Sequence, residues 1–205
     1  MPDHFALGKW GHGLAIAVLA AFMLLVPGHA ADAQNITYRE VTLGILNHDA
    51  SFLGGKEKGV DINPELKFGS PIDDATLLRV PPEFQWLVQP RPTIGFTVNT
   101  AGFTDQAYVG ATWTWQLAGN LLLPGDGITL GFFFGPGLNN GDIRAAQPDR
   151  KSLGSNLLFR EALEFGYRIN AVYTVSAYVD HVSNGGFARY NQSINDFGGR
   201  IGVGF

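Results

Sequence analysis

Eight segments of this chain alternate apolar and polar side chains with a period of two residues, at 41–45, 60–68, 94–99, 108–117, 128–134, 156–168, 173–183 and 197–205. That period is typical of β-strands that present one face to an apolar phase. The 27 glycines and 12% aromatic residues also favour strands joined by tight turns. We therefore expect an all-β fold of eight antiparallel strands.

The charged residues of these segments decide which face is turned inward. Six of them fall on the small and polar face: Asp61, Glu65, Lys67, Arg160, Glu164 and Arg168. A water-soluble barrel would carry such charges on its outside, whereas a membrane barrel encloses them. The second arrangement is favoured by aromatic residues on the apolar face, including Trp113, Trp115, Phe159 and Phe165, and by the terminal Phe205.

We predict an eight-stranded transmembrane β-barrel of the Gram-negative outer membrane, with a soluble lipid-binding barrel as the alternative. The last segment ends in Phe205 and resembles the C-terminal strand that the outer-membrane barrel assembly machinery recognises. Eight strands enclose an interior that side chains just fill, so a diffusion pore is not expected.

Residues 1–33 have the parts of a cleaved secretory signal peptide. Lys9 precedes an apolar run at 14–26, and small residues follow, with cleavage expected after Ala30 or Ala33. The run of about 13 residues is shorter than the about 20 that a membrane-spanning helix needs. We expect export, a single mature domain at 34–205, and only His48 and His181 among the histidines that remain.

The composition excludes several classes of protein. Only 16% of residues are charged and the net charge is −4, without a cluster of lysines or arginines, so a nucleic-acid partner is not expected. The chain has no cysteine, and the mature sequence shows no spacing typical of metal ligands. We expect no metal site and no cofactor.

Two features do not fit a simple barrel. The segment at 69–91 contains several prolines and is long for a periplasmic turn. Glu161 falls on the apolar face, where a carboxylate at the middle of the bilayer is costly. A bulge or a functional role would account for Glu161.

His181 and Ser183 share the apolar face of the seventh segment. Residues two apart on a strand have Cα atoms about 6.5 Å apart, which lets an imidazole take the proton of a hydroxyl. With both termini periplasmic, the seventh strand reaches the outer surface near Ser183. Polar groups at that depth cost only about 0 to 1 kcal/mol. The pair is therefore a candidate nucleophile and base beside the lipopolysaccharide leaflet.

The run 181–186, His-Val-Ser-Asn-Gly-Gly, with its distance from the terminal Phe205, resembles the C-terminal signature of the lipid A 3-O-deacylase (PagL) family. The likeness extends to 158–161, 166–168 and 107–110. It implies a hydrolase that modifies lipopolysaccharide by removing the 3-linked acyl chain of lipid A, a serine esterase with Ser183 as nucleophile and His181 as base. Asn184 and the backbone near Gly186 become candidates to stabilise the oxyanion.

The family places a glutamate about a dozen residues after the serine, where this chain has Asn195 followed by Asp196. If Ser183 pairs with Asn195 across a loop at 184–194, Asn195 shares the outward face with His181 and Asp196 points into the lumen. A bulge would turn Asp196 outward instead. The missing glutamate also favours an alternative function, a catalytically silent structural or adhesive barrel.

A second candidate cluster, at residues 48–51, begins with His48 and Asp49 where we expect an exposed loop, and its spacing fits no catalytic template. The sequence leaves a monomer and a homodimer both open.

Overall fold

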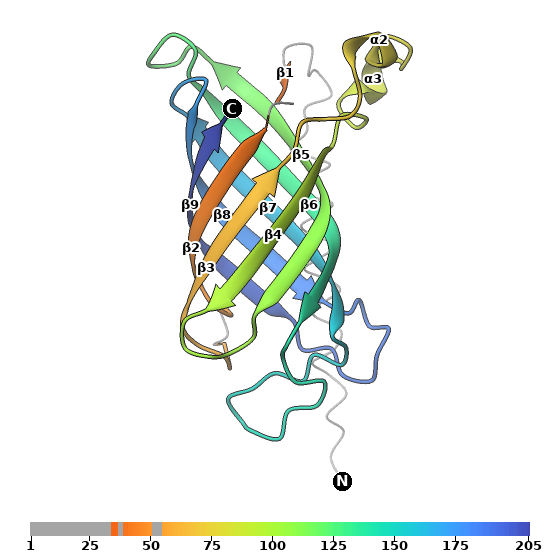
Figure 1. Cartoon of the computed structure of the whole chain (residues 1–205), viewed down its shortest axis with the longest axis vertical. Helices are drawn as coiled ribbons and strands as arrows, with labels where there is room; N and C mark the ends of the chain where they lie inside the picture. Colours follow the sequence, from red (N-terminus) through yellow and green to blue (C-terminus); the bar gives the residue numbers. More distant parts are fainter. Residues whose placement is uncertain (1–33, 37–38, 51–54) are drawn as a thin grey trace.

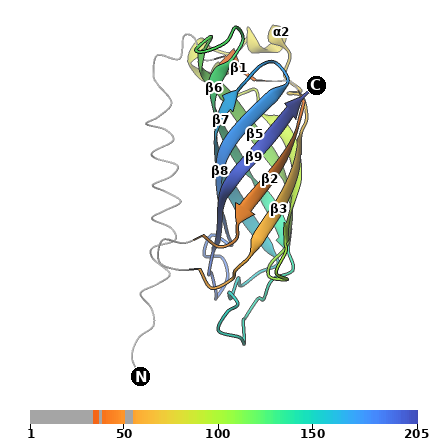
Figure 2. The same ribbon diagram turned by 90° about the vertical axis from the view of Figure 1, so that its left-hand side faces the viewer.

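The computed structural model describes residues 34–36, 39–50 and 55–205. The predicted signal peptide at 1–33 lies outside the described residues. Eight antiparallel strands form a closed barrel (Figures 1 and 2): β2 (Glu40–Asn47), β3 (Val60–Lys67), β4 (Arg91–Asn99), β5 (Gln106–Gly119), β6 (Gly127–Asn139), β7 (Leu157–Arg168), β8 (Tyr173–Ser183) and β9 (Ile194–Gly204). The predicted number and order of strands are confirmed.

Closure of the barrel removes the free strand edges. Each strand pairs with the next along the chain, and β9 pairs with β2, with Val41 opposite Val203. A short strand, β1 (Gln34–Asn35), adds to β5 near one rim. Every ladder therefore finds its hydrogen-bond partners within the sheet, as a strand surrounded by lipid requires.

The two faces of the sheet have opposite chemistry. On β2 and β4 the outward side chains are apolar and exposed, for example Ile45 at 63% and Val98 at 51%. On β3 the charged side chains point into the lumen, where Asp61, Glu65 and Lys67 are buried. An apolar exterior around a charged interior is the reverse of a soluble lipid-binding barrel, so that alternative is wrong and the membrane barrel is confirmed.

Ion pairs fill the half of the lumen nearer the C-terminus. Lys67 Nζ lies 2.9 Å from Glu164 Oε2, and Arg200 lies 3.1 Å from Glu65. We call this group the inner ion network, and it has three carboxylates and three cations: Glu40, Glu65, Glu164, Lys67, Arg91 and Arg200. The charges of the network therefore balance.

The long connection at 68–90 packs on the outside of the barrel at the end where the C-terminus lies (Figure 1). It contains two four-residue helices, α2 (Asp74–Leu77), whose first turn Asp73 caps, and α3 (Pro82–Gln85). No helix in the described part of the chain is long and apolar enough to cross a membrane.

The same connection changes the environment of two tryptophans that we expected on the outward apolar face. Trp113 Nε1 donates to the carbonyl of Leu87 at 2.6 Å, and Trp115 Nε1 donates to that of Trp86 at 3.1 Å. Trp115 is only 4% exposed because Trp86 lies against it. Trp115 therefore lies on the outer face of β5, as expected, but the connection covers it.

The inner ion network predicts a large cost for removing one buried cation. Arg200→Met leaves the carboxylates of Glu65 and Glu164 without one of their partners, and breaking such a pair costs about 3–5 kcal/mol. The free energy of unfolding in urea, measured in detergent micelles, should fall by that amount. Ile201→Leu, at the next residue on the lipid face, should change it by less than about 1.5 kcal/mol. Equal effects of the two substitutions would contradict the charged interior.

Candidate active site

His181 and Ser183 lie on the outer face at the end of β8, and both side chains are half-buried. Ser183 is the last residue of the strand, at the end of the barrel that carries the loops 100–105, 140–156 and 184–193 (Figure 1). The position follows from the strand period, because the alternate residues Tyr178, Asp180 and Val182 point into the lumen and are buried. The pair therefore faces the surrounding lipid near one rim.

Two polar residues flank His181 on the neighbouring strands. Glu161 is directly opposite on β7, and Asn195 is directly opposite on β9. Directly opposed residues have Cβ atoms about 4.5–5.5 Å apart. Glu161, His181 and Asn195 form a polar row across three strands on an otherwise apolar face, and no bulge turns Glu161 inward.

The imidazole is held by the asparagine. Nδ1 of His181 lies 2.7 Å from Oδ1 of Asn195, and with the proton on Nδ1 the ring donates to the amide carbonyl. The pairing that we expected between Ser183 and Asn195 is wrong by two residues, because Asn195 pairs with His181. A shift of two keeps the side chain on the same face, so Asn195 still lies on the outward side.

Asp196, the alternative partner for His181, lies on the opposite face. Its side chain is fully buried in the lumen, where Oδ1 accepts the backbone N–H of Asp49 at 3.0 Å. The ladder between β8 and β9 is regular across Asp180 and Asp196. The bulge that would turn Asp196 towards His181 is therefore not formed.

The loop after Ser183 is held by its own hydrogen bonds. Asn184 is buried, and its amide donates to the carbonyl of Leu153 at 2.7 Å and to that of Tyr190. Its Oδ1 accepts the N–H of Gly186 at 2.9 Å. Both oxyanion candidates are thus engaged in shaping the loop, while the N–H of Gly185 points to Ser183 Oγ at 3.4 Å.

An aromatic strip borders the serine. Phe159 is directly opposite Ser183 on β7, and its ring stacks on Phe134 at 6.4 Å and contacts Phe187 at 6.0 Å. All three rings are exposed on the outer face. The strip offers an apolar surface beside a hydroxyl, as contact with an acyl chain requires.

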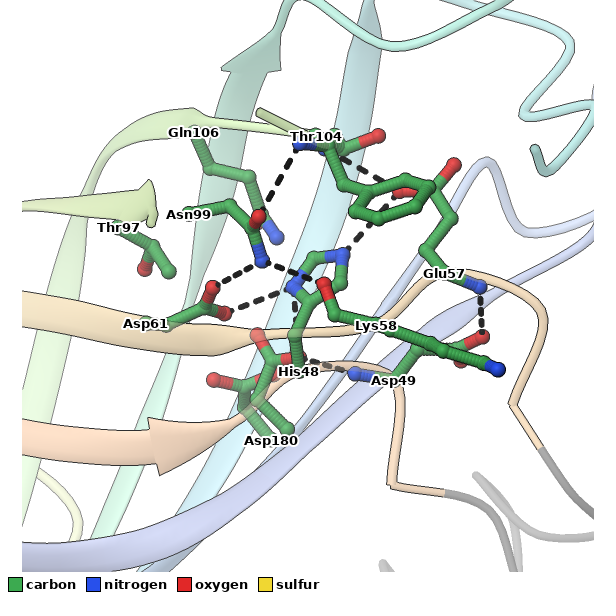
Figure 3. A network of polar contacts seen from close by, with 12 residues as sticks. His48, Asp49, Glu57, Lys58, Asp61, Thr97, Asn99, Thr104, Gln106 and Asp180 are labelled. Carbon is green, nitrogen blue, oxygen red and sulfur yellow. Dashed lines mark hydrogen bonds and ion pairs between the residues drawn. The ribbon is translucent and has the colours of Figure 1, made fainter. Parts of the chain in front are cut away.

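His48 belongs to a second polar cluster, which residues from distant parts of the sequence form. We expected an exposed loop, but His48 and Asp49 are buried at the loop end of the lumen (Figure 3). His48 lies 2.8 Å from Asp61, 3.1 Å from Glu57 and 3.5 Å from Asp196. His48, Asp61 and Asp196 come from distant segments of the chain, and their ligand atoms lie within 4.8 Å of one another.

The cluster changes the protonation of its members. Burial acts to lower the pKa of His48, but hydrogen bonds with Asp61 and Glu57 outweigh it and raise the pKa to about 10. Burial acts to raise the pKa of Glu57, and the bonds from His48 and the Lys151 backbone lower it to about 2. At neutral pH the ring is therefore cationic and Glu57 is ionised.

Fold and site together define a class: an eight-stranded outer-membrane β-barrel with a serine and a histidine on its lipid-facing surface. Residues 85–204 match the sequence profile of the lipid A 3-O-deacylase (PagL) family. Because this match spans more than half of the chain, the protein belongs to that family.

A solved structure has the same fold. The outer membrane enzyme PagL aligns with a TM-score of 0.58 and 14% identity, over 81% of this chain and 99% of that one. The N-terminal β-barrel domain of Pseudomonas aeruginosa OprF gives 0.46 and 7%, over 84% and 100%, and Neisserial surface protein A (NspA) gives 0.46 and 13%, over 82% and 96%. None of the curated proteins compared with the chain matches it.

Proposed function

We propose that this protein is an outer-membrane esterase that hydrolyses the 3-O-linked acyl ester of lipid A, after export by its N-terminal signal peptide and insertion by the barrel assembly machinery through Phe205. The observation that carries the proposal is the hydrogen bond of 2.7 Å between His181 and Asn195, on the lipid face two residues from Ser183. Membership of the lipid A 3-O-deacylase family gives the substrate class.

In the proposed mechanism Ser183 Oγ attacks the ester carbonyl carbon while His181 Nε2 takes the hydroxyl proton. The tetrahedral intermediate expels the sugar oxygen, to which His181 returns the proton, and leaves the acyl chain on Ser183. Water then attacks the acyl-enzyme with His181 as base, releasing the fatty acid and regenerating the serine. In our proposal the N–H of Gly185, whose nitrogen lies 3.4 Å from Ser183 Oγ, donates to the oxyanion within the loop that Asn184 and Gly186 shape.

Asn195 fixes the tautomer of His181 but brings no charge. Its carbonyl accepts the Nδ1 proton, which keeps Nε2 free to act as base, whereas a glutamate would also stabilise the imidazolium. In our proposal Glu161, directly opposite His181, supplies negative charge from the other side. It also explains a carboxylate on the lipid-facing surface near the rim.

The neutral Asn195 is the one observation that favours the second candidate function, a catalytically silent structural or adhesive barrel. Such a barrel has no use for a serine beside an oriented imidazole and an aromatic strip. We prefer the esterase for that reason.

Lipid A from cells that produce the protein should lack one ester-linked acyl chain in mass spectra. Ser183→Ala and His181→Ala should each lower the rate by at least about a thousandfold, because nucleophile and base act as a unit. Ser193→Ala, in the same loop region, is the control and should retain activity. Unchanged acyl loss in Ser183→Ala would exclude the mechanism, and intact lipid A with correctly folded wild type would support the silent barrel.

Asn195→Glu should raise kcat by about tenfold or more with little change in KM, because the carboxylate stabilises the imidazolium in the transition state only. Asn195→Leu removes the acceptor of the Nδ1 proton and should lower kcat. Purified variants in detergent with a short-chain ester substrate would give both constants. If Asn195→Leu is as active as wild type, Asn195 does not orient His181.

A further inference from the structure

The loop end of the lumen holds more carboxylates than cations among the described residues. Five buried carboxylates lie there: Asp49, Glu57, Asp61, Asp180 and Asp196. Lys151 pairs with Asp49, and Arg160 pairs with Asp180. The remaining three surround His48, whereas the inner ion network in the other half of the lumen is balanced.

The contacts of the His48 ring assign different roles to its two nitrogens (Figure 3). Nε2 lies 3.1 Å from Glu57, so a proton on Nε2 satisfies that carboxylate. Nδ1 faces two further carboxylate oxygens, of Asp61 at 2.8 Å and of Asp196 at 3.5 Å. A second ring proton can bond Asp61 well, but Asp196 lies too far for a normal hydrogen bond.

Two oxygens of the cluster have no hydrogen-bond partner among the described residues. They are Oδ2 of Asp196, whose residue is fully buried, and Oδ1 of Asp180, which is 2% exposed. The two aspartates are directly opposite each other on β8 and β9. Opposed like charges and unpaired buried oxygens are both unfavourable, so a further cation would stabilise this arrangement.

We propose that Nδ1 of His48 and one carboxylate oxygen each of Asp61 and Asp196 bind a divalent transition-metal ion of the zinc class. These three ligand atoms already lie within 4.8 Å of one another. Tetrahedral bonds of about 2.0–2.2 Å hold ligand atoms about 3.4 Å apart, so small shifts complete the site. The ring nitrogen favours zinc over calcium, magnesium or manganese, which prefer oxygen ligands.

Glu57 completes the arrangement as an outer partner. A metal-binding histidine commonly donates its other ring N–H to a carboxylate, which orients the ring, and Glu57 accepts from Nε2 in this way. The ion takes the place of the second ring proton and joins the ends of β2, β3 and β9. Because Asp196 follows Asn195, the site also fixes the strand that holds the partner of His181. The proposal does not depend on the esterase activity.

The test is the zinc content of the full protein, purified from outer membranes in detergent, refolded with zinc chloride and dialysed. Mass-spectrometric metal analysis should find about one zinc ion per chain. Cobalt(II) in place of zinc should give visible absorption bands of a low-symmetry site. His48→Gln, Asp61→Asn and Asp196→Asn should each reduce the content to below about a tenth of an ion. Glu57→Gln should weaken zinc affinity by about 10- to 100-fold while the site persists.

Asp105→Asn is the matched control, because Asp105 is an acid at the same end of the barrel that bonds Asn99 and Asn140 outside the cluster. It should bind zinc as wild type does. Heat-modifiable electrophoretic mobility reports whether each variant is folded. If a ligand variant fails to fold, the zinc affinity of Glu57→Gln tests the proposal in its place. Wild type without zinc after refolding, or full zinc content in folded His48→Gln, would overturn the proposal and leave a proton as the only cation of the cluster.

Discussion

The rest of this structure depends on one constraint, that lipid offers no hydrogen-bond partner to a strand. The backbone groups must pair within a closed barrel, and the pleat then sends successive side chains alternately to lipid and lumen. A shift of one residue would invert every strand. The closed ladders from β2 to β9 thus determine that His181 and Asn195 meet outside, and that His48 and Asp196 meet inside.

The two faces solve the problem of buried charge differently. In the lumen, ion pairs such as Arg200 with Glu65 satisfy charges away from water, and Arg200 also lies 4.1 Å from the ring of Tyr178. On the outer face, polar groups are confined to a row near the rim, where their cost is small. An ester bond of an outer-leaflet lipid lies at the same depth in our proposal, so placement gives the site its substrate.

The two-residue period of the sequence was sufficient to predict the eight strands and the outward position of Asn195. A register error of two residues leaves a side chain on the same face of the sheet, so the error in pairing did not change that position. The period was not sufficient for the register itself, which the loop at 184–193 sets. The cluster around His48 was missed because its members come from β3, β9 and a loop, and a local spacing carries no sign of them. Alternation put Trp115 on the outer face but gave no sign of its contact with Trp86.

The central claim is that Ser183 is an activated nucleophile on the lipid face of this barrel. A long-chain alkyl fluorophosphonate tests it directly, since the reagent partitions into micelles and phosphonylates only activated serines. Mass spectrometry of the intact protein and its peptides should show one adduct, on Ser183, that disappears in His181→Ala. An unmodified wild type, or an adduct that persists in His181→Ala, would contradict the account.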